Sequence, residues 1–185
     1  MRSCTIGCKA SCIADTDCLI YAPLSNGGTF LISGGVSSAN SYSVIYANTA
    51  TSPINTCDNS PDCYIYCRNS ITACTNTLSN YADSTVTSYS VIDCVSTFTC
   101  TNTCLNQIQC YIDCTSAPTC VNKLTNIPAA GLATSLLPTV NCRSSGTCTN
   151  TITNSMGSFI DCSLGTGSCS NTITGSLATT SVNHI

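Results

Sequence analysis

The segment Tyr42-Ser-Val-Ile-Tyr-Ala-Asn-Thr-Ala-Thr-Ser-Pro-Ile-Asn-Thr-Cys57 decides the fold, because the chain repeats it 47 residues later. The second copy, Tyr89-Ser-Val-Ile-Asp-Cys-Val-Ser-Thr-Phe-Thr-Cys-Thr-Asn-Thr-Cys104, aligns without a gap. Self-similarity at a period of this size is the signature of a repeat architecture. We therefore predict one domain over residues 1–185, with repeat units at about 8–56, 57–103 and 104–151 and a partial unit at 152–185.

A shorter motif recurs inside each unit: an apolar residue, Ile-Asp-Cys, a loop, a second Cys, and then Thr-Asn-Thr-Ile-Thr or a variant. It begins at Cys67, Cys94, Cys114, Cys142 and Cys162, in steps of 27, 20, 28 and 20 residues, with earlier copies at Cys12 and Ala47. The alternating steps indicate two coils per repeat. The chain contains no Glu and is rich in Thr, Val and Ile, which favour strands. We predict an all-β, disulfide-stapled parallel β-solenoid or β-helix of about seven coils.

The cysteines are predicted to form disulfides within coils. Where Cys94 and Cys100 stand, the first repeat has Ala47 and Pro53, and where Cys104 and Cys110 stand, the last has Ile152 and Ser158. Joint loss is expected of bonded partners, because losing one alone leaves a reactive thiol. The predicted pairs are Cys12–Cys18, Cys57–Cys63, Cys67–Cys74, Cys94–Cys100, Cys104–Cys110, Cys114–Cys120, Cys142–Cys148 and Cys162–Cys169, with Cys4–Cys8 by elimination. Zinc binding is disfavoured by the spacing of five intervening residues and the lack of a usable His.

The same composition restricts compartment and partners. Eighteen Cys in 185 residues is typical of oxidising compartments, so we expect an extracellular protein, secreted or at the cell surface, although the start of the chain lacks the apolar stretch of a signal peptide. The net charge of -3 and the scattered Lys and Arg offer no basic surface for nucleic acid. No apolar run is long enough to span a membrane.

Side chains alternate between the two faces of a strand, so inward cysteines imply an inward Asn and outward threonines. The predicted inward amides are Asn55, Asn76, Asn102, Asn122, Asn150 and Asn171, which could form a hydrogen-bonded ladder. The predicted outward array comprises Thr75, Thr77, Thr99, Thr101, Thr103, Thr119, Thr125, Thr147, Thr149, Thr151, Thr153, Thr172 and Thr174, joined by Ser168 and Ser170 and interrupted by Ala73, Leu105, Val121 and Lys123. Three interpretations stay open: strand propensity alone, O-glycan attachment, and ice binding.

Two family resemblances bear on fold and function. The strings Asn150-Thr-Ile-Thr-Asn154 and Asn171-Thr-Ile-Thr-Gly175 resemble repeats of right-handed parallel β-helix proteins of the pectate-lyase-like class. That resemblance implies lyase or hydrolase activity only where carboxylates cluster with a base across coils. The Thr array resembles the ice-binding surfaces of hyperactive antifreeze β-solenoids.

No catalytic group is expected, because no carboxylate cluster includes a base and the only His, His184, has no neighbour in sequence to orient it. We therefore predict that the protein is not an enzyme and uses no cofactor or metal.

Two further columns are predicted on the other strand. Asp93, Asp113 and Asp161, with Asn141 between them, precede a Cys; they are interpreted as turn-forming side chains in preference to a Ca²⁺ site. An outward apolar column, which must be covered by the chain's own loops or by a partner, is predicted from Val44, Tyr64, Val91, Tyr111, Val140 and Phe159.

Both ends of the sequence run directly into repeat, without a predicted cap. We therefore expect a structural subunit of an extracellular filament, coat or appendage whose coils stack on other copies of the chain, head to tail or laterally. The alternative function is that of an ice-binding protein.

Overall fold

A computed structural model describes residues 7–14, 17–23, 25–34, 42–80, 89–106, 109–125, 138–155, 158–163, 167–175 and 181–184. These residues form two parallel sheets, each of eight strands. The first sheet holds β1 (Lys9–Ile13), β3 (Thr29–Ser33), β5 (Ile54–Asp58), β7 (Ala73–Ser79), β9 (Thr99–Leu105), β11 (Thr119–Thr125), β13 (Thr147–Thr153) and β15 (Ser168–Thr174). The second sheet holds β2 (Leu19–Tyr21), β4 (Ser43–Tyr46), β6 (Cys63–Tyr66), β8 (Ser90–Asp93), β10 (Cys110–Asp113), β12 (Thr139–Asn141), β14 (Ser158–Asp161) and β16 (Ser181–His184).

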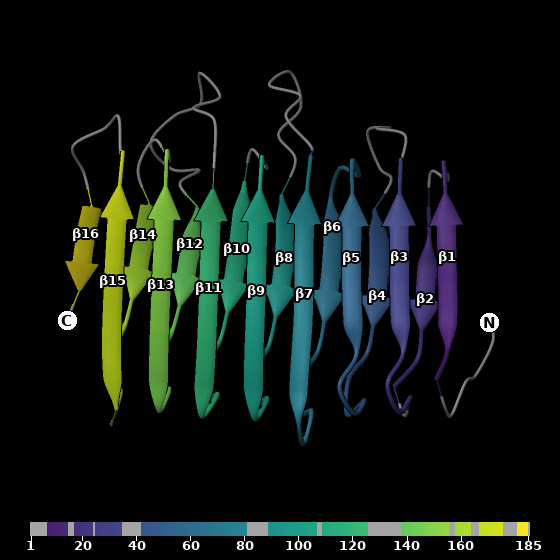
Figure 1. The fold of residues 1–185 in the computed structure, drawn as a ribbon, viewed down its shortest axis with the longest axis horizontal. Coiled ribbons are helices and arrows are strands. Elements are labelled where there is room, and N and C mark those ends of the chain that lie inside the picture. Colours follow the sequence, from purple (N-terminus) through teal and green to yellow (C-terminus); the bar gives the residue numbers. More distant parts are fainter. Residues whose placement is uncertain are drawn as a thin grey trace.

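Each strand pairs with the strand two places along the chain, so the backbone winds as a flattened solenoid. Figure 1 shows the odd-numbered strands as one layer and the even-numbered strands as a second layer behind it, running the opposite way. The prediction of an all-β, disulfide-rich parallel solenoid is confirmed. The two layers leave a thin core between them and two broad outer faces.

The structure has eight coils where the sequence predicted about seven. The missed coil is formed by β2 and β3, whose copy of the motif begins at Ala22, in register with Ala47. This coil was missed because no Cys occurs between Cys18 and Cys57. In addition, Cys12 does not start a copy of the Ile-Asp-Cys motif. Cys12 pairs in register with Ile32, which pairs with Cys57. All three lie near the carboxyl ends of first-sheet strands, whereas the first Cys of the motif follows a strand of the second sheet.

The core contains apolar columns from both sheets and one amide column from the first sheet. The apolar column of the second sheet consists of Ile20, Ile45, Ile65, Ile92, Ile112, Val140 and Ile160, all buried. Opposite lie the amides, of which Asn55, Asn76, Asn102, Asn122 and Asn150 are at most 1% exposed. The predicted ladder is present. Each Nδ2 donates to the Oδ1 of the next Asn, from Asn55 through to Asn171, at 2.8 or 2.9 Å.

Disulfides close both edges of this core in two rows. The first row lies where the chain turns from the second sheet to the first: Cys67–Cys74, Cys94–Cys100, Cys114–Cys120, Cys142–Cys148 and Cys162–Cys169. The second row lies at the opposite turn: Cys12–Cys18, Cys57–Cys63 and Cys104–Cys110. These pairs are the ones assigned from joint loss. Cys8 is also disulfide-bonded, and its predicted partner Cys4 lies outside the described residues.

The second row falls on short coils in the middle of the chain, although the short connection from β13 to β14 has Ile152 and no disulfide at this position. Along that column of the first sheet, Cys57, Leu78, Cys104 and Leu124 follow one another in register. Where a Cys stands, the disulfide holds a short connection, as between β9 and β10. Where Leu78 stands, the connection from β7 to β8 runs through residues 80–89. The 47-residue repeat is therefore one stapled coil followed by one open coil.

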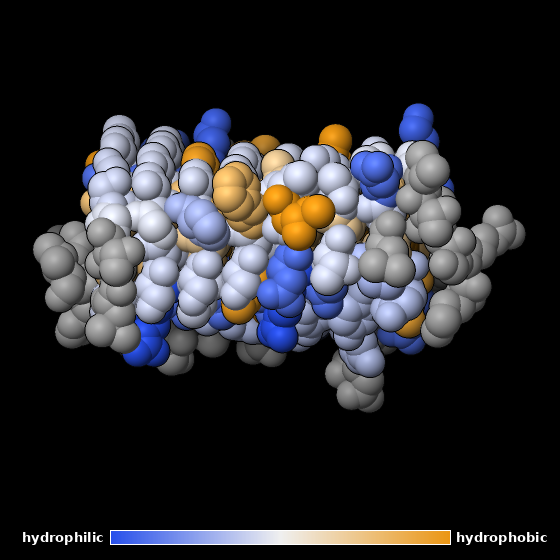
Figure 2. All heavy atoms as spheres, turned by 90° about the horizontal axis from the view of Figure 1, so that it is seen from below, coloured by the Kyte–Doolittle hydropathy of each residue, from blue (hydrophilic) through white to orange (hydrophobic). Residues whose placement is uncertain are grey.

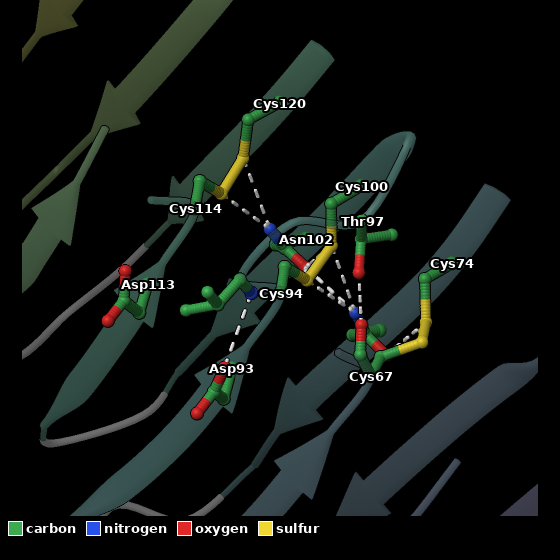
Figure 3. The surroundings of a disulfide bond; sticks show 12 residues. Cys67, Cys74, Asp93, Cys94, Thr97, Cys100, Asn102, Asp113, Cys114 and Cys120 are labelled. Carbon is green, nitrogen blue, oxygen red and sulfur yellow. Dashed lines mark hydrogen bonds between the residues drawn. A yellow bond between two sulfur atoms is a disulfide. The ribbon is translucent and has the colours of Figure 1, made fainter. Parts of the chain in front are cut away.

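The amide ladder runs beside the first disulfide row. Asn102 Nδ2 lies 3.6 Å from Sγ of both Cys114 and Cys120, and its Oδ1 lies 3.1 Å from Cys100 Sγ (Figure 3). Sulfur in a disulfide carries no proton, so the contact with Oδ1 is a packing contact. The polar column is thus enclosed by sulfur and Ile side chains, where its hydrogen bonds are shielded from water.

Figure 2 looks onto the long edge of the solenoid at which the first disulfide row lies. Most of the coloured surface along this edge is pale, neither strongly polar nor strongly apolar, and apolar residues lie near its middle. The large apolar side chains exposed on turns here are Ile71 and Phe98, at 75% and 60%. They occupy the same turn position in neighbouring coils, and a pair of exposed apolar side chains is ordinary on a protein surface.

In the turns that follow strands of the second sheet, a residue other than Gly adopts the left-handed backbone region. Asn69, Ser96, Ser116 and Ser144 have φ between 55° and 59°, and Thr49 has φ 60°. Left-handed backbone costs a residue with a β-carbon about 1–2 kcal/mol, least for Asn. At Thr49 a hydrogen bond from Oγ1 to the Pro23 carbonyl, at 2.6 Å, offsets this cost.

Ser116 has no such support among its hydrogen bonds, so it offers a test. Ser116→Val is expected to destabilise the fold by about 1–2 kcal/mol, because a β-branched side chain crowds the left-handed backbone. Ser116→Asn is the control and is expected to stay within about 0.5 kcal/mol of wild type. Urea unfolding measures both, and equal midpoints for the two variants would contradict the assignment.

Candidate functional site

The outer face of the first sheet carries the predicted Thr array. Its two central columns flank the buried amides: one contains Thr75, Thr101 and Thr149, the other Thr77, Thr103, Thr151 and Thr172. Thr99, Thr119 and Thr147 form a column on one side, and Thr125, Thr153 and Thr174 form a column on the other. We call this surface the threonine face. All of these side chains are exposed or half-buried.

The spacing of this array is set by the backbone. Neighbouring strands lie about 4.8 Å apart, and alternate residues of a strand about 6.6 Å apart. Because Asn occupies the same inward position in six consecutive coils, the flanking residues stay in register over the whole face. The β-branched side chain of Thr has restricted rotamers, so its hydroxyl and methyl groups are also held in a narrow range.

The array has one internal gap and one weak member. In the sixth coil, β11 carries Val121 and Lys123 in the two central columns. They lie between Thr101 and Thr103 of β9 and Thr149 and Thr151 of β13. At the rim, the hydroxyl oxygen of Thr125 is buried and does not face solvent. Two blocks of regular Thr positions therefore flank coil six.

The predicted Asp column on the second sheet forms turns. Asp113 Oδ1 accepts the backbone N–H of Thr115 at 2.9 Å, and Asp161 Oδ1 accepts that of Ser163 at 2.9 Å. Asn141 makes the same contact two residues on. Asp93 is buried and also pairs with Arg68, whose Nε lies 2.7 Å from Oδ2. These hydrogen bonds support the turn interpretation.

The predicted outward apolar column needs one correction. Val140 is fully buried and aligns with Ile112 and Ile160 in the core, and Thr139 occupies the outward position. The error arose because this coil reads Thr-Val-Asn-Cys, which lacks the usual bulky residue before the Ile position. The rest of the predicted column is in register: Val44, Tyr64, Val91 and Tyr111 follow one another, and Thr139 links Tyr111 to Phe159.

Comparison with protein-family models, with curated proteins and with solved structures finds no match to this chain. Neither the pectate-lyase-like class nor the antifreeze solenoids therefore receives support beyond the parallel solenoid itself. Function has to be argued from the surfaces.

The described residues offer no metal site or membrane helix. Nowhere in the described ranges do three His, Cys, Asp or Glu side chains gather as a metal ligand set. None of the described elements is a helix long and apolar enough to cross a membrane. His184 ends β16, and its side chain lies outside the described part of the structure.

Sequence reasoning missed a tyrosine surface on the second sheet. A column of Tyr21, Tyr46 and Tyr66 continues the Asp column toward the N-terminal coils. Tyr46 and Tyr66 stack at 4.8 Å with an interplanar angle of 8°. The signal was the 47-residue period itself, which relates Tyr46 to Asp93 and Tyr66 to Asp113 and so places both tyrosines in the Asp column.

Three phenols at the second sheet, those of Tyr64, Tyr66 and Tyr89, have a raised pKa and so remain neutral at physiological pH. Burial raises the pKa of Tyr89 to about 12, with neighbouring Tyr111 adding to the effect. Burial is also the main cause that raises the pKa of Tyr64 and of Tyr66. The rings of these three side chains are therefore uncharged.

Proposed function

We propose that this chain is an extracellular ice-binding protein that acts through the threonine face. The observation that carries the proposal is the register of its central columns: Thr75 and Thr77, Thr101 and Thr103, and Thr149 and Thr151 lie on the same two lines of a flat parallel sheet. Ice is a crystal, so a protein that binds its surface needs groups on a regular lattice. Few other ligands need that regularity.

The chemistry of the array fits this role. Each Thr offers a hydroxyl that exchanges hydrogen bonds with water and a methyl group that water surrounds without bonding. The face carries little charge. The cations in its described central columns are Lys9 and Lys123. Charged groups hold water in their own hydration shells, so a nearly uncharged face leaves first-layer water free to follow the lattice.

The core supports the face by keeping it rigid. Directly beneath the central columns lies the amide ladder, and the disulfide rows fix both edges of the sheet. A rigid array loses little conformational entropy on binding, which is why preorganised surfaces bind more tightly.

Thermal hysteresis and ice-crystal shaping test the proposal. Wild type is expected to show both, and Thr101→Tyr is expected to remove most of the hysteresis, because the ring stands above the plane of the array. The matched control is Thr139→Tyr on the opposite sheet, where Tyr111 already occupies the neighbouring position. Wild type with neither effect at high concentration would overturn the proposal.

A gain of function sharpens the test. Val121→Thr combined with Lys123→Thr joins the two blocks of the array into one lattice. Hysteresis is expected to increase over wild type, since the contiguous ice-binding area grows. A decrease would mean that the two blocks do not act as one surface.

Stacking of copies into a filament stays a second candidate. In the described residues β15 is the outer strand of its sheet, and all seven of its residues are exposed. A strand with a free edge is a template for pairing with another chain. Sedimentation of the oxidised protein tests this, and a single monomeric species would exclude it. O-glycan attachment to the threonine face is a further prediction, which intact mass measures.

A further inference from the structure

A hollow lies on the second sheet, on the face opposite the threonines. It has a volume of about 390 Å³ and is lined by Asp17, Leu19, Tyr42, Val44 and Tyr46, together with Cys18. A second hollow of about 190 Å³ shares Tyr42, Val44 and Tyr46 and adds Tyr64 and Tyr66. Together they form one depression over coils one to three, within the size range of small-molecule sites.

The depression exists because a small residue stands among large ones. Val44 points outward from β4 between Tyr42 and Tyr46, and it pairs with Tyr64 of the next coil. The rings rise around it, so Val44 is only 5% exposed although it is on the outer face. Val44 forms the floor and the tyrosines form the walls.

The tyrosine rings are inclined to one another, and one pair is nearly perpendicular. The Tyr42 and Tyr64 rings are inclined by 88° with centroids 6.2 Å apart. Tyr46 stacks on Tyr66 and meets Tyr21 at 64°. Rings set at angles around a common floor make an aromatic corner, and the face of an aromatic ring carries the negative end of its quadrupole.

The charges at the depression are negative. Asp17 lines it, and its Oδ1 accepts the backbone N–H of Tyr42 at 3.2 Å. Asp62 lies close enough to Tyr64 to contribute to its raised pKa. Among the described residues no Lys or Arg lines either hollow. Ring faces and carboxylates together attract a cation and repel an anion.

The neighbouring coils show the protein using this chemistry itself. The guanidinium of Arg68 lies 5.7 Å from the centroid of the Tyr66 ring and pairs with Asp93. Further along the same column Asp93 and Asp113 replace the tyrosines. Tyr66, one wall of the second hollow, thus already holds a cation of the chain, whereas the described lining of the first hollow, around Val44, includes neither Tyr66 nor Arg68.

We propose that the depression around Val44 binds a quaternary ammonium group, as found in choline and in choline lipids. Such a group is a bulky monocation with weak hydration, so it gains from ring faces more than it loses in leaving water. Small metal ions keep their waters and prefer several oxygen ligands, which the depression does not supply. This site lies on the opposite sheet from the threonine face and is independent of ice binding.

Tyrosine fluorescence measures the binding directly, because the chain contains no Trp. Titration with tetramethylammonium chloride is expected to give a saturable change, and tert-butanol, a neutral molecule of similar shape, is expected to give none. Equal responses to both would overturn the proposal, since they would show apolar contact without cation recognition. A linear, unsaturated response to tetramethylammonium would overturn it as well.

Matched variants locate the site. Tyr42→Leu is expected to weaken binding about tenfold, and Tyr89→Leu, at the equivalent position one repeat later, is expected to leave it unchanged. Asp17→Asn keeps an oxygen acceptor for the Tyr42 N–H and is expected to weaken binding several-fold through charge alone. Equal effects of Tyr42→Leu and Tyr89→Leu would place the binding elsewhere and overturn the assignment.

Two probes distinguish the source of the group. Free choline in the titration reports a soluble ligand, and co-sedimentation with phosphatidylcholine vesicles reports a lipid headgroup. Either result supports the site if Tyr42→Leu weakens it about tenfold. The absence of both choline binding and co-sedimentation with the wild-type protein would overturn the proposal.

Discussion

Full reduction of the disulfides is expected to unfold the solenoid at room temperature. Each bond closes a loop of six or seven residues, for which the chain-entropy model gives about 2.3 kcal/mol. Eight such bonds join described cysteines and together contribute roughly 18 kcal/mol. That sum exceeds the net stability of about 5–15 kcal/mol of an ordinary domain.

The thin core explains why the disulfides supply so much of the free energy of unfolding. Each strand of the first sheet points only a few side chains inward, and in the six strands of that sheet from β5 to β15 one of them is an amide, whose burial contributes little apolar area. The far-UV circular dichroism of the oxidised and reduced protein measures the effect. A reduced chain that kept its strand signal and melted cooperatively would contradict the prediction.

Single bonds are expected to matter less, and the chain supplies its own comparison. Ala47 shares a column with Cys67 and Cys94, and Pro53 shares one with Cys74 and Cys100, so that turn holds its shape without a disulfide. Joint replacement of Cys94 and Cys100 by Ala is therefore expected to lower stability by about 2–4 kcal/mol and to leave the fold intact.

The architecture could be predicted because the repeat imposes it. Matched losses such as Ile152 with Ser158 fixed which cysteines pair, since each coil is an independent copy of the same geometry. Counting from a Cys also predicted the inward Asn correctly. These inferences needed only alternation along a strand and comparison of one coil with the next.

Features that depend on neighbouring coils of different sequence could not be predicted. The coil of β2 and β3 has Phe30 where the coils from β5 onward have Asn. It contains no Cys after Cys18, so its sequence carries no recognisable motif. The depression at Val44 depends on Tyr64 lying beside it, although a turn and a whole strand separate them in the chain. Connections of unequal length hide that register from the sequence.

The amide ladder gives the second large effect. Asn102→Leu is expected to destabilise the fold by about 3–5 kcal/mol, because it removes two buried hydrogen bonds. Asn76 Nδ2 then loses its acceptor and Asn122 Oδ1 loses its donor, and both atoms are enclosed by protein. A fall in melting temperature of roughly 10 °C, measured by calorimetry on the oxidised protein, is the expected result.

Asn55→Leu is the matched control within the same column. Asn55 donates to Asn76, but its own Oδ1 is buried without a partner in the described structure, next to Phe30. Its replacement breaks one ladder bond and removes an unsatisfied oxygen, so the expected loss is less than half that of Asn102→Leu. If the two variants lost equal stability, the ladder would act only by filling space. A larger loss at Asn102 means that hydrogen bonding along the solenoid holds the threonine face in register.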